Sequence, residues 1–113
     1  MIASPLAEIE RRARRWRRAL RRNGVTAEIV DGESTVGGGS LPGQTLPTKL
    51  VALPLPHPDR AAAALRAADP PVIARIEQDR LVLDPRTVLA EEDQELLRAV
   101  TKVARYMQEI ANG

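Results

Sequence analysis

The sequence contains no cysteine and no phenylalanine, and its 113 residues include a single histidine, His57. Without cysteine the chain can form neither a disulfide framework nor a thiolate metal site, and one histidine alone cannot build a histidine-based zinc site. One tryptophan and one tyrosine leave Leu, Val, Ile and Ala to fill the interior. We therefore predict one small domain over residues 1–113, with an aliphatic core and no metal centre.

Long apolar runs are missing as well. No stretch is long enough to span a bilayer, and the N-terminus lacks the apolar segment of a signal peptide. We therefore expect a cytoplasmic protein with no membrane partner. Lysine is also scarce, because only Lys49 and Lys102 are present. With one histidine and no cysteine, these residues supply no nucleophile, base and orienting group for a self-sufficient active site.

The pattern of apolar residues predicts elements in the order α-β-β-α-β-β-α. Ser4 and Pro5 can start a first helix, and Asn23–Gly24 can end it. We expect helices over 5–22, 59–68 and from 90 onward, and strands over 25–33, 49–55, 72–77 and 80–84. Gln78–Asp79 would form a two-residue hairpin turn, although glutamine is unusual where a primed turn needs a positive φ. This order favours an α+β two-layer sandwich, with about four mostly antiparallel strands covered by helices.

Two apolar stripes at helical spacing indicate which helix faces are buried. The first helix carries Leu6, Ile9, Ala13, Trp16 and Leu20. The last helix carries Leu96, Val100, Val103, Met107 and Ile110. Both stripes predict packing against the sheet.

A glycine-rich run over residues 35–47 holds four of the seven glycines. Three consecutive glycines lose much backbone entropy on folding, and the leucines and prolines around them do not suit a flexible linker. The run lacks both the dinucleotide pattern and the P-loop pattern, so phosphate binding is disfavoured. We expect a shaped loop at an interface near the chemistry, with four candidate residues: Gly37, Gly38, Gly39 and Ser40.

Arginine is concentrated near the N-terminus, where eight of the fifteen arginines lie between residues 11 and 22. Clustered arginines can neutralise RNA phosphates without reading bases. The alternative is a solvated or partner-docking helix face, since Glu8 and Glu10 share the helix and the acidic run 91–95 could pair with its arginines. The candidate contacts are Arg11, Arg14, Arg15, Arg18 and Arg22.

Two further arginines, Arg75 and Arg86, lie on or beside the predicted second hairpin. An arginine among apolar strand residues is costly unless it has an anionic partner. Each could contact an anionic group of a substrate. A structural ion pair with Glu77 or Asp84 is the alternative.

Three motifs together resemble the C-terminal part of bacterial selenocysteine synthase, the L-seryl-tRNA(Sec) selenium transferase family of pyridoxal-phosphate enzymes with the aspartate-aminotransferase fold. They are the segments over residues 33–43 (ESTVGGGSLPG), 69–76 (DPPVIARI) and 83–88 (LDPRTV). The resemblance covers residues 1 to about 95, whereas the stretch 96–113 carries no motif of the family.

The resemblance implies that this chain is the small C-terminal domain of a larger homo-oligomeric enzyme. That enzyme would convert seryl-tRNA(Sec) to selenocysteinyl-tRNA(Sec) with selenophosphate. The lysine that holds pyridoxal phosphate would lie in a large cofactor domain outside this chain, so no catalytic residue is expected here and the chain alone should bind no cofactor. The glycine loop would face the active-site cleft, and the arginine helix would contact the large domain or tRNA(Sec).

Two alternatives stay open. The chain could be a free-standing module that binds tRNA or another RNA, or that serves assembly. It could also be the small domain of a related pyridoxal-phosphate lyase.

Overall fold

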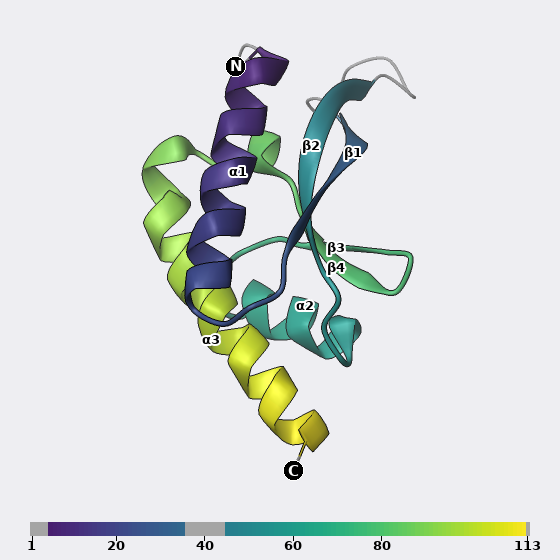
Figure 1. Ribbon diagram of the computed structural model, residues 1–113, viewed down its shortest axis with the longest axis vertical. Helices are drawn as coiled ribbons and strands as arrows, with labels where there is room; N and C mark the ends of the chain where they lie inside the picture. The colour runs from purple at the N-terminus through teal and green to yellow at the C-terminus, as the bar shows by residue number, and fades with distance from the viewer. Residues whose placement is uncertain (1–4, 36–44, 113) are drawn as a thin grey trace.

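Two helices lie against one face of a four-stranded sheet, and the C-terminal helix packs on these two, in the computed structural model, which describes residues 5–35 and 45–112 (Figure 1). The helices are α1 (Leu6–Arg22), α2 (Pro58–Arg66) and α3 (Asp93–Asn112), and the strands are β1 (Glu28–Thr35), β2 (Thr45–Leu53), β3 (Arg75–Glu77) and β4 (Arg80–Leu83). Two short 3-10 turns, η1 (Pro85–Thr87) and η2 (Ala90–Glu92), lead into α3. The predicted α+β order of helices and strands is confirmed.

The sheet has the order β1-β2-β4-β3, and each neighbouring pair is antiparallel. β1 and β2 form a long hairpin that is paired from Glu28 opposite Ala52 to Thr35 opposite Thr45. β3 and β4 form a short one, whose turn residues Gln78 and Asp79 have φ values of 52° and 62°. These positive values confirm the primed turn, despite the glutamine.

The first helix buries most of its predicted apolar face. Ile9, Ala13, Trp16 and Leu20 are buried, whereas Leu6 in the first turn is exposed, contrary to the prediction. The helix ends as expected, because Gly24 adopts a φ of 80°, which suits glycine.

Strand boundaries differ from the predicted ones where loop residues are held by the helices. Val25 is buried but precedes β1, and its N–H donates to the carbonyl of Leu20 (2.9 Å). Val72 likewise precedes β3, and its N–H donates to the carbonyl of Leu65 (2.8 Å). A buried apolar residue just before a strand gives the same sequence signal as a strand residue. The predicted starts at residues 25 and 72 were therefore three residues too early for β1 and β3.

β2 begins at Thr45, four residues earlier than predicted, and it includes Pro47. Proline fits there because β4 pairs only with Val51–Leu53, so at Pro47 the described strands provide β1 alone as a neighbour.

The main core lies between the helices and the sheet face that carries Val51, Leu53, Leu81 and Leu83. Within α3, Leu96, Val100, Ala104 and Met107 are buried, whereas Val103 is half-buried and Ile110 is exposed. The predicted stripe is therefore confirmed except at Ile110, since Val103 also packs against the core.

The opposite face of the sheet has a smaller buried cluster of Leu50, Ala52 and Val82. A Cβ at Gly32 would lie 2.3 Å from Leu50 Cδ1, so a larger residue there would require the Leu50 side chain to move.

Within residues 5–35 and 45–112, no helix is long and apolar enough to cross a membrane. The same residues hold no cluster of His, Cys, Asp and Glu side chains that could ligate a metal ion.

Candidate functional site

The glycine loop itself, with Gly37, Gly38, Gly39 and Ser40, lies outside the described residues. The hairpin from which it projects is described on both sides. Near the end of β1, the Glu33 carboxylate accepts a hydrogen bond from the Thr45 hydroxyl at the start of β2. We call this loop end of the β1–β2 hairpin, where β1 ends and β2 begins, the hairpin base.

Arg75, at the start of β3, reaches the hairpin base. Its Nη1 donates to the main-chain carbonyl of Glu33 (3.0 Å) and lies 4.0 Å from Asp84 Oδ2, and its Nη2 lies 3.2 Å from Glu77 Oε2. The structural alternative of pairing with Glu77 or Asp84 is thus confirmed. Contact with an anionic substrate stays a prediction.

Asp84 organises the turn that follows β4. Its side chain is only 4% exposed, and its Oδ1 accepts hydrogen bonds from the Thr48 hydroxyl (2.8 Å) and from the Arg86 N–H (3.0 Å). The second bond caps η1, whose first residue is Pro85. The sequence predicted Asp84 only as an ion-pair partner of Arg75 or Arg86, although an aspartate directly before a proline is the usual signal of such a cap.

Arg86 binds the other strand of the hairpin. Its Nε donates to the main-chain carbonyl of Pro47 (2.8 Å). Arg75 and Arg86 therefore each bind a carbonyl at the base of the β1–β2 hairpin, one on each strand. We call this group the hairpin-base network; it consists of Glu33, Thr45, Pro47, Thr48, Arg75, Asp84 and Arg86.

The three sequence motifs meet in this network. Glu33 belongs to the first motif, Arg75 to the second, and Asp84 and Arg86 to the third. The spacing along the chain gave no sign that they would be neighbours, because antiparallel pairing of β2 with β4 and of β4 with β3 brings them together.

A cavity of about 410 Å³ lies beside the network, and Arg75 and Asp84 both line it. Its other walls come from the segment that leads into β3 and from the segment between η1 and the first turn of α3. The sequence did not predict this cavity, because α3 provides part of it.

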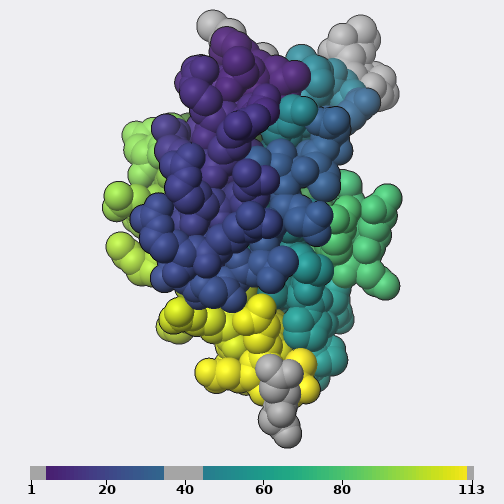
Figure 2. All heavy atoms as spheres, in the orientation of Figure 1, coloured from purple at the N-terminus to yellow at the C-terminus, as the bar shows by residue number. Residues whose placement is uncertain are grey.

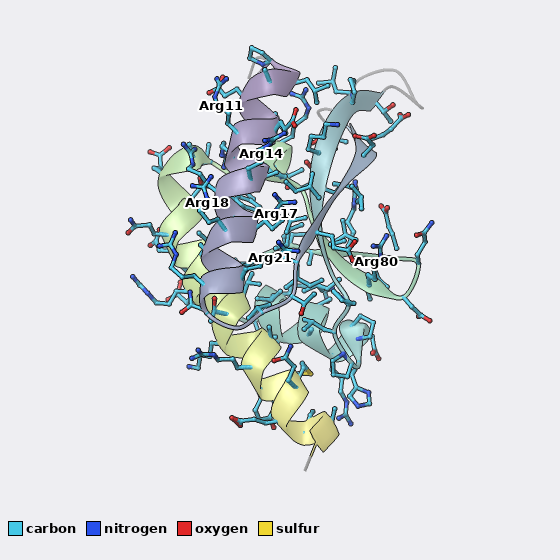
Figure 3. The ribbon with its side chains drawn as sticks, in the orientation of Figure 1. Arg11, Arg14, Arg17, Arg18, Arg21 and Arg80 are labelled. Atoms are coloured by element: carbon cyan, nitrogen blue, oxygen red, sulfur yellow. The ribbon has the colours of Figure 1, made fainter. Side chains whose placement is uncertain are left out.

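The arginines predicted to contact RNA or a partner all lie on the exposed side of α1. Figure 3 shows Arg11 and Arg18 on the side of α1 away from the strands, and Arg14 on the side next to the β1–β2 hairpin. Figure 2 shows α1 forming much of this surface. Arg15 and Arg22 are exposed as well. Arg14 pairs with Glu10 one turn earlier (2.7 Å). These side chains are accessible to a partner.

Arg12 on the same helix has a different role, which sequence reasoning missed. It is 7% exposed, and its Nη2 binds Asp93 Oδ1 at 2.6 Å while its Nε donates to Asp93 Oδ2 at 3.3 Å. Its Nη1 and Nη2 also donate to the carbonyls of Pro85 and Val88, both at 2.9 Å. The predicted pairing of α1 with the acidic run 91–95 is therefore confirmed at this residue. Its place four residues before buried Trp16 was the available signal.

Neither lysine belongs to the network. Lys49 on β2 pairs with Asp31 on β1, and this hydrogen bond raises the pKa of Lys49. Lys102 is exposed on α3.

Comparison with known proteins agrees with the geometry. The family model of L-seryl-tRNA selenium transferase matches residues 1–89. The L-seryl-tRNA(Sec) selenium transferase of Hyphomonas neptunium is 43% identical over 106 residues, which cover 91% of this chain and 23% of that protein. The protein of the same name from Solidesulfovibrio magneticus is 44% identical over 115 residues, which cover 96% of this chain and 24% of that protein.

The chain thus spans about a quarter of the length of these curated relatives. All three motifs lie within the matched residues, and the hairpin-base network joins them in space. The chain belongs to the L-seryl-tRNA selenium transferase family.

Proposed function

We propose that this chain is the small C-terminal domain of an enzyme that converts seryl-tRNA(Sec) to selenocysteinyl-tRNA(Sec) with selenophosphate. The observation that carries the proposal is the match itself, which covers more than nine-tenths of the chain but about a quarter of each relative. Both relatives carry the transferase name, which supports this function over that of a related lyase. Since the reaction acts on tRNA, we place the protein in the cytoplasm.

Pyridoxal phosphate is the cofactor that the family resemblance implies, and the residues of this chain do not fit it. A Schiff base needs a lysine that can lose its proton. The bond from Asp31 stabilises the charged form of Lys49, and Lys102 stands exposed on α3, apart from the hairpin-base network. The cofactor would therefore be held by the part of the parent enzyme outside this chain, and no step of the reaction is assigned to the residues here.

The role that we propose for this chain is to shape one side of the active-site cleft. The hairpin-base network binds both strands of the hairpin whose tip contains Gly37–Ser40. We propose that the loop faces the cleft, and that Arg75 and Arg86 lie on its substrate side. Arg75 and Arg86 donate to one carbonyl on each strand, and together they would fix the direction in which the hairpin projects.

We propose that the exposed arginines of α1 contact either tRNA(Sec) or the large cofactor domain. They are accessible, and Arg14 is the one that shares an ion pair with a glutamate of the helix. The parent enzyme would be a homo-oligomer. An isolated RNA-binding module is the second candidate function, and these arginines are the observation that favours it.

A chimeric enzyme tests the proposal. The segment of the Solidesulfovibrio magneticus protein that matches this chain is replaced by residues 1–113, and selenium transfer to seryl-tRNA(Sec) is measured. We expect the chimera to retain transfer, whereas the same protein without the segment should not. A folded, cofactor-loaded chimera with no transfer would contradict the proposal.

A further inference from the structure

The cavity beside the hairpin-base network has the chemistry of a binding site for an uncharged group. Six of its ten lining residues are apolar: Pro70, Pro71, Val72, Ile73, Val88 and Leu96. The polar ones are Arg75, Asp84, Thr87 and Glu92. An apolar lining with a few convergent polar groups is the usual composition of a specific pocket.

Two of these polar side chains have buried atoms without a hydrogen bond among the described residues. Asp84 Oδ2 is ion-paired with Arg75 Nη1 at 4.0 Å and Arg75 Nη2 with Glu77 at 3.2 Å, but neither atom makes a hydrogen bond, and nor does Arg75 Nε. Asp84 is 96% buried, so an acceptor that lacks a hydrogen bond there costs free energy. A main-chain amide could supply the missing hydrogen bonds, because its N–H can donate to Asp84 Oδ2 and its carbonyl can accept from Arg75 Nε.

The charges in the cavity disfavour an anion. Asp84 and Glu92 supply two carboxylates against the one guanidinium of Arg75, and Glu77 lies 3.2 Å from that guanidinium. A phosphate or carboxylate ligand would meet more negative than positive charge, whereas an amide would not.

The rim of the cavity is apolar and exposed. Ile73, which lines it, is 63% exposed, and Leu89, which directly follows the lining residue Val88, is 60% exposed. Large apolar residues exposed beside a pocket mark an interaction surface. About three-quarters of the length of the relatives lies outside this chain, so polypeptide that could cover the rim is available in the parent protein.

We propose that the cavity, with Ile73 and Leu89, is the docking surface for an uncharged polypeptide segment from the rest of the parent enzyme. The segment inserts an apolar side chain into the cavity, and its main-chain amide pairs with Asp84 and Arg75. This mode combines side-chain burial with main-chain hydrogen bonds, as in other peptide-recognition sites. The inference rests on the proposed function, since that function supplies the parent enzyme.

The first test uses N-acetyl-leucine methylamide, which offers an apolar side chain between two amides. It is titrated into the 113-residue chain and followed by amide chemical shifts. We expect saturable shifts at Ile73, Thr87 and Val88, and none with 4-methylpentanoate or inorganic phosphate. The proposal would be overturned by the absence of shifts or by equal shifts with the two anions. It would also be overturned by shifts centred on Tyr106, which lies on α3 and does not line this cavity.

Substitutions of exposed apolar residues refine this test. Ile73→Ser with Leu89→Ser should weaken binding of the capped leucine at least tenfold. Tyr106→Ser is the matched control, because Tyr106 is 58% exposed and does not line this cavity. It should leave binding within twofold of the original chain. Equal effects of both changes would overturn the proposal.

The second test measures docking separately from activity. Amide hydrogen exchange of residues 85–96 should be at least tenfold slower in the chimeric enzyme than in the isolated chain. The Ile73→Ser, Leu89→Ser chimera should lose this protection. If the chimera is active and residues 85–96 exchange equally fast in it and in the isolated chain, docking is overturned but the proposed function stands. Slow exchange in an inactive one would support docking and contradict the function.

Discussion

The two sides of α1 use arginine in opposite ways. On the inner side, Arg12 is buried, makes four hydrogen bonds and lies with its Cζ 5.6 Å from the centre of the Trp16 ring. On the outer side, Arg11, Arg15 and Arg18 are exposed to solvent. The same side chain therefore anchors the helix in one direction and presents charge in the other.

The difference shows that burial, rather than the number of arginines, decides what each one contributes. Arg12 joins α1 to η1, to the residue after it and to the first residue of α3. Removing one partner of a buried pair leaves the other uncompensated. An exposed charge is solvated and screened, so it adds little stability and stays available for a partner.

The largest effect is expected at Arg12. Arg12→Met should lower the free energy of unfolding by about 3–5 kcal/mol, because Asp93 and the carbonyls of Pro85 and Val88 lose their donor. Urea unfolding followed by the fluorescence of Trp16, which lies against Arg12, measures the change. The control, Arg11→Met, should stay within about 0.5 kcal/mol. A loss at Arg12 no larger than in the control would end the distinction between the two sides.

Arg75 tests the range between these extremes, since its side chain is 34% exposed. Arg75→Met should cost about 1–2 kcal/mol, because the carbonyl of Glu33 and the buried Asp84 both lose their donor or counter-charge. Chemical denaturation is the measurement. Arg80→Met, on the same hairpin, is the control and should cost less. If Arg80 proves the more important residue for stability, the hairpin-base network does not act as described.

The exposed arginines on the outer side of α1 should affect binding but not the stability of the fold. Arg15→Gln with Arg18→Gln should leave unfolding within about 0.5 kcal/mol. If these arginines contact tRNA phosphates, the slope of log affinity against log salt should fall by about 2, one for each contact removed. Gel shifts with tRNA at several salt concentrations give the slope. Arg60→Gln with Arg66→Gln on α2 is the control. A slope near zero for the original chain would favour contact with the large domain instead.

The smallest effect is expected from the exposed pairs beside α1. Arg14 lowers the pKa of Glu10, so this pair adds stability above the ordinary pKa of glutamate and loses it as the pH falls through the lowered value. Asp31 raises the pKa of Lys49, so that pair adds stability below the ordinary pKa of lysine and loses it as the pH rises through the raised value.

Thermal unfolding measured from acid to alkaline pH tests both pairs. Glu10→Gln should slightly reduce the loss of thermal stability at acid pH. Asp31→Asn should slightly reduce the loss at alkaline pH. A steep change in either variant would mean that exposed pairs stabilise the fold as strongly as the buried one.

Much of the fold could be predicted because its signals are local. The spacing of Ile9, Ala13 and Trp16 selects one helix face within a few residues, and Gln78–Asp79 separates two apolar segments by the length of a two-residue turn. Strand limits were less predictable. Val25 and Val72 carry the same apolar signal as strand residues, and only their hydrogen bonds to helices distinguish them.

The candidate site could be predicted by residue but not by arrangement. Arg75 and Arg86 stood out because an arginine among apolar residues needs a partner. Both donate hydrogen bonds to main-chain carbonyls of β1 and β2, which no side-chain pattern reveals. The cavity depends on α3, which carries no motif of the family.

The sequence by itself determined the order of helices and strands, the apolar faces, the family and the surplus of exposed arginines on the first helix. Only the tertiary structure decided which arginine is buried and where the three motifs meet. The physical reason is distance along the chain. Helix and turn signals act over a few residues, whereas Arg12 and Asp93 are 81 positions apart and Arg75 and Glu33 are 42 apart. Such contacts exist only once the sheet and helices have packed.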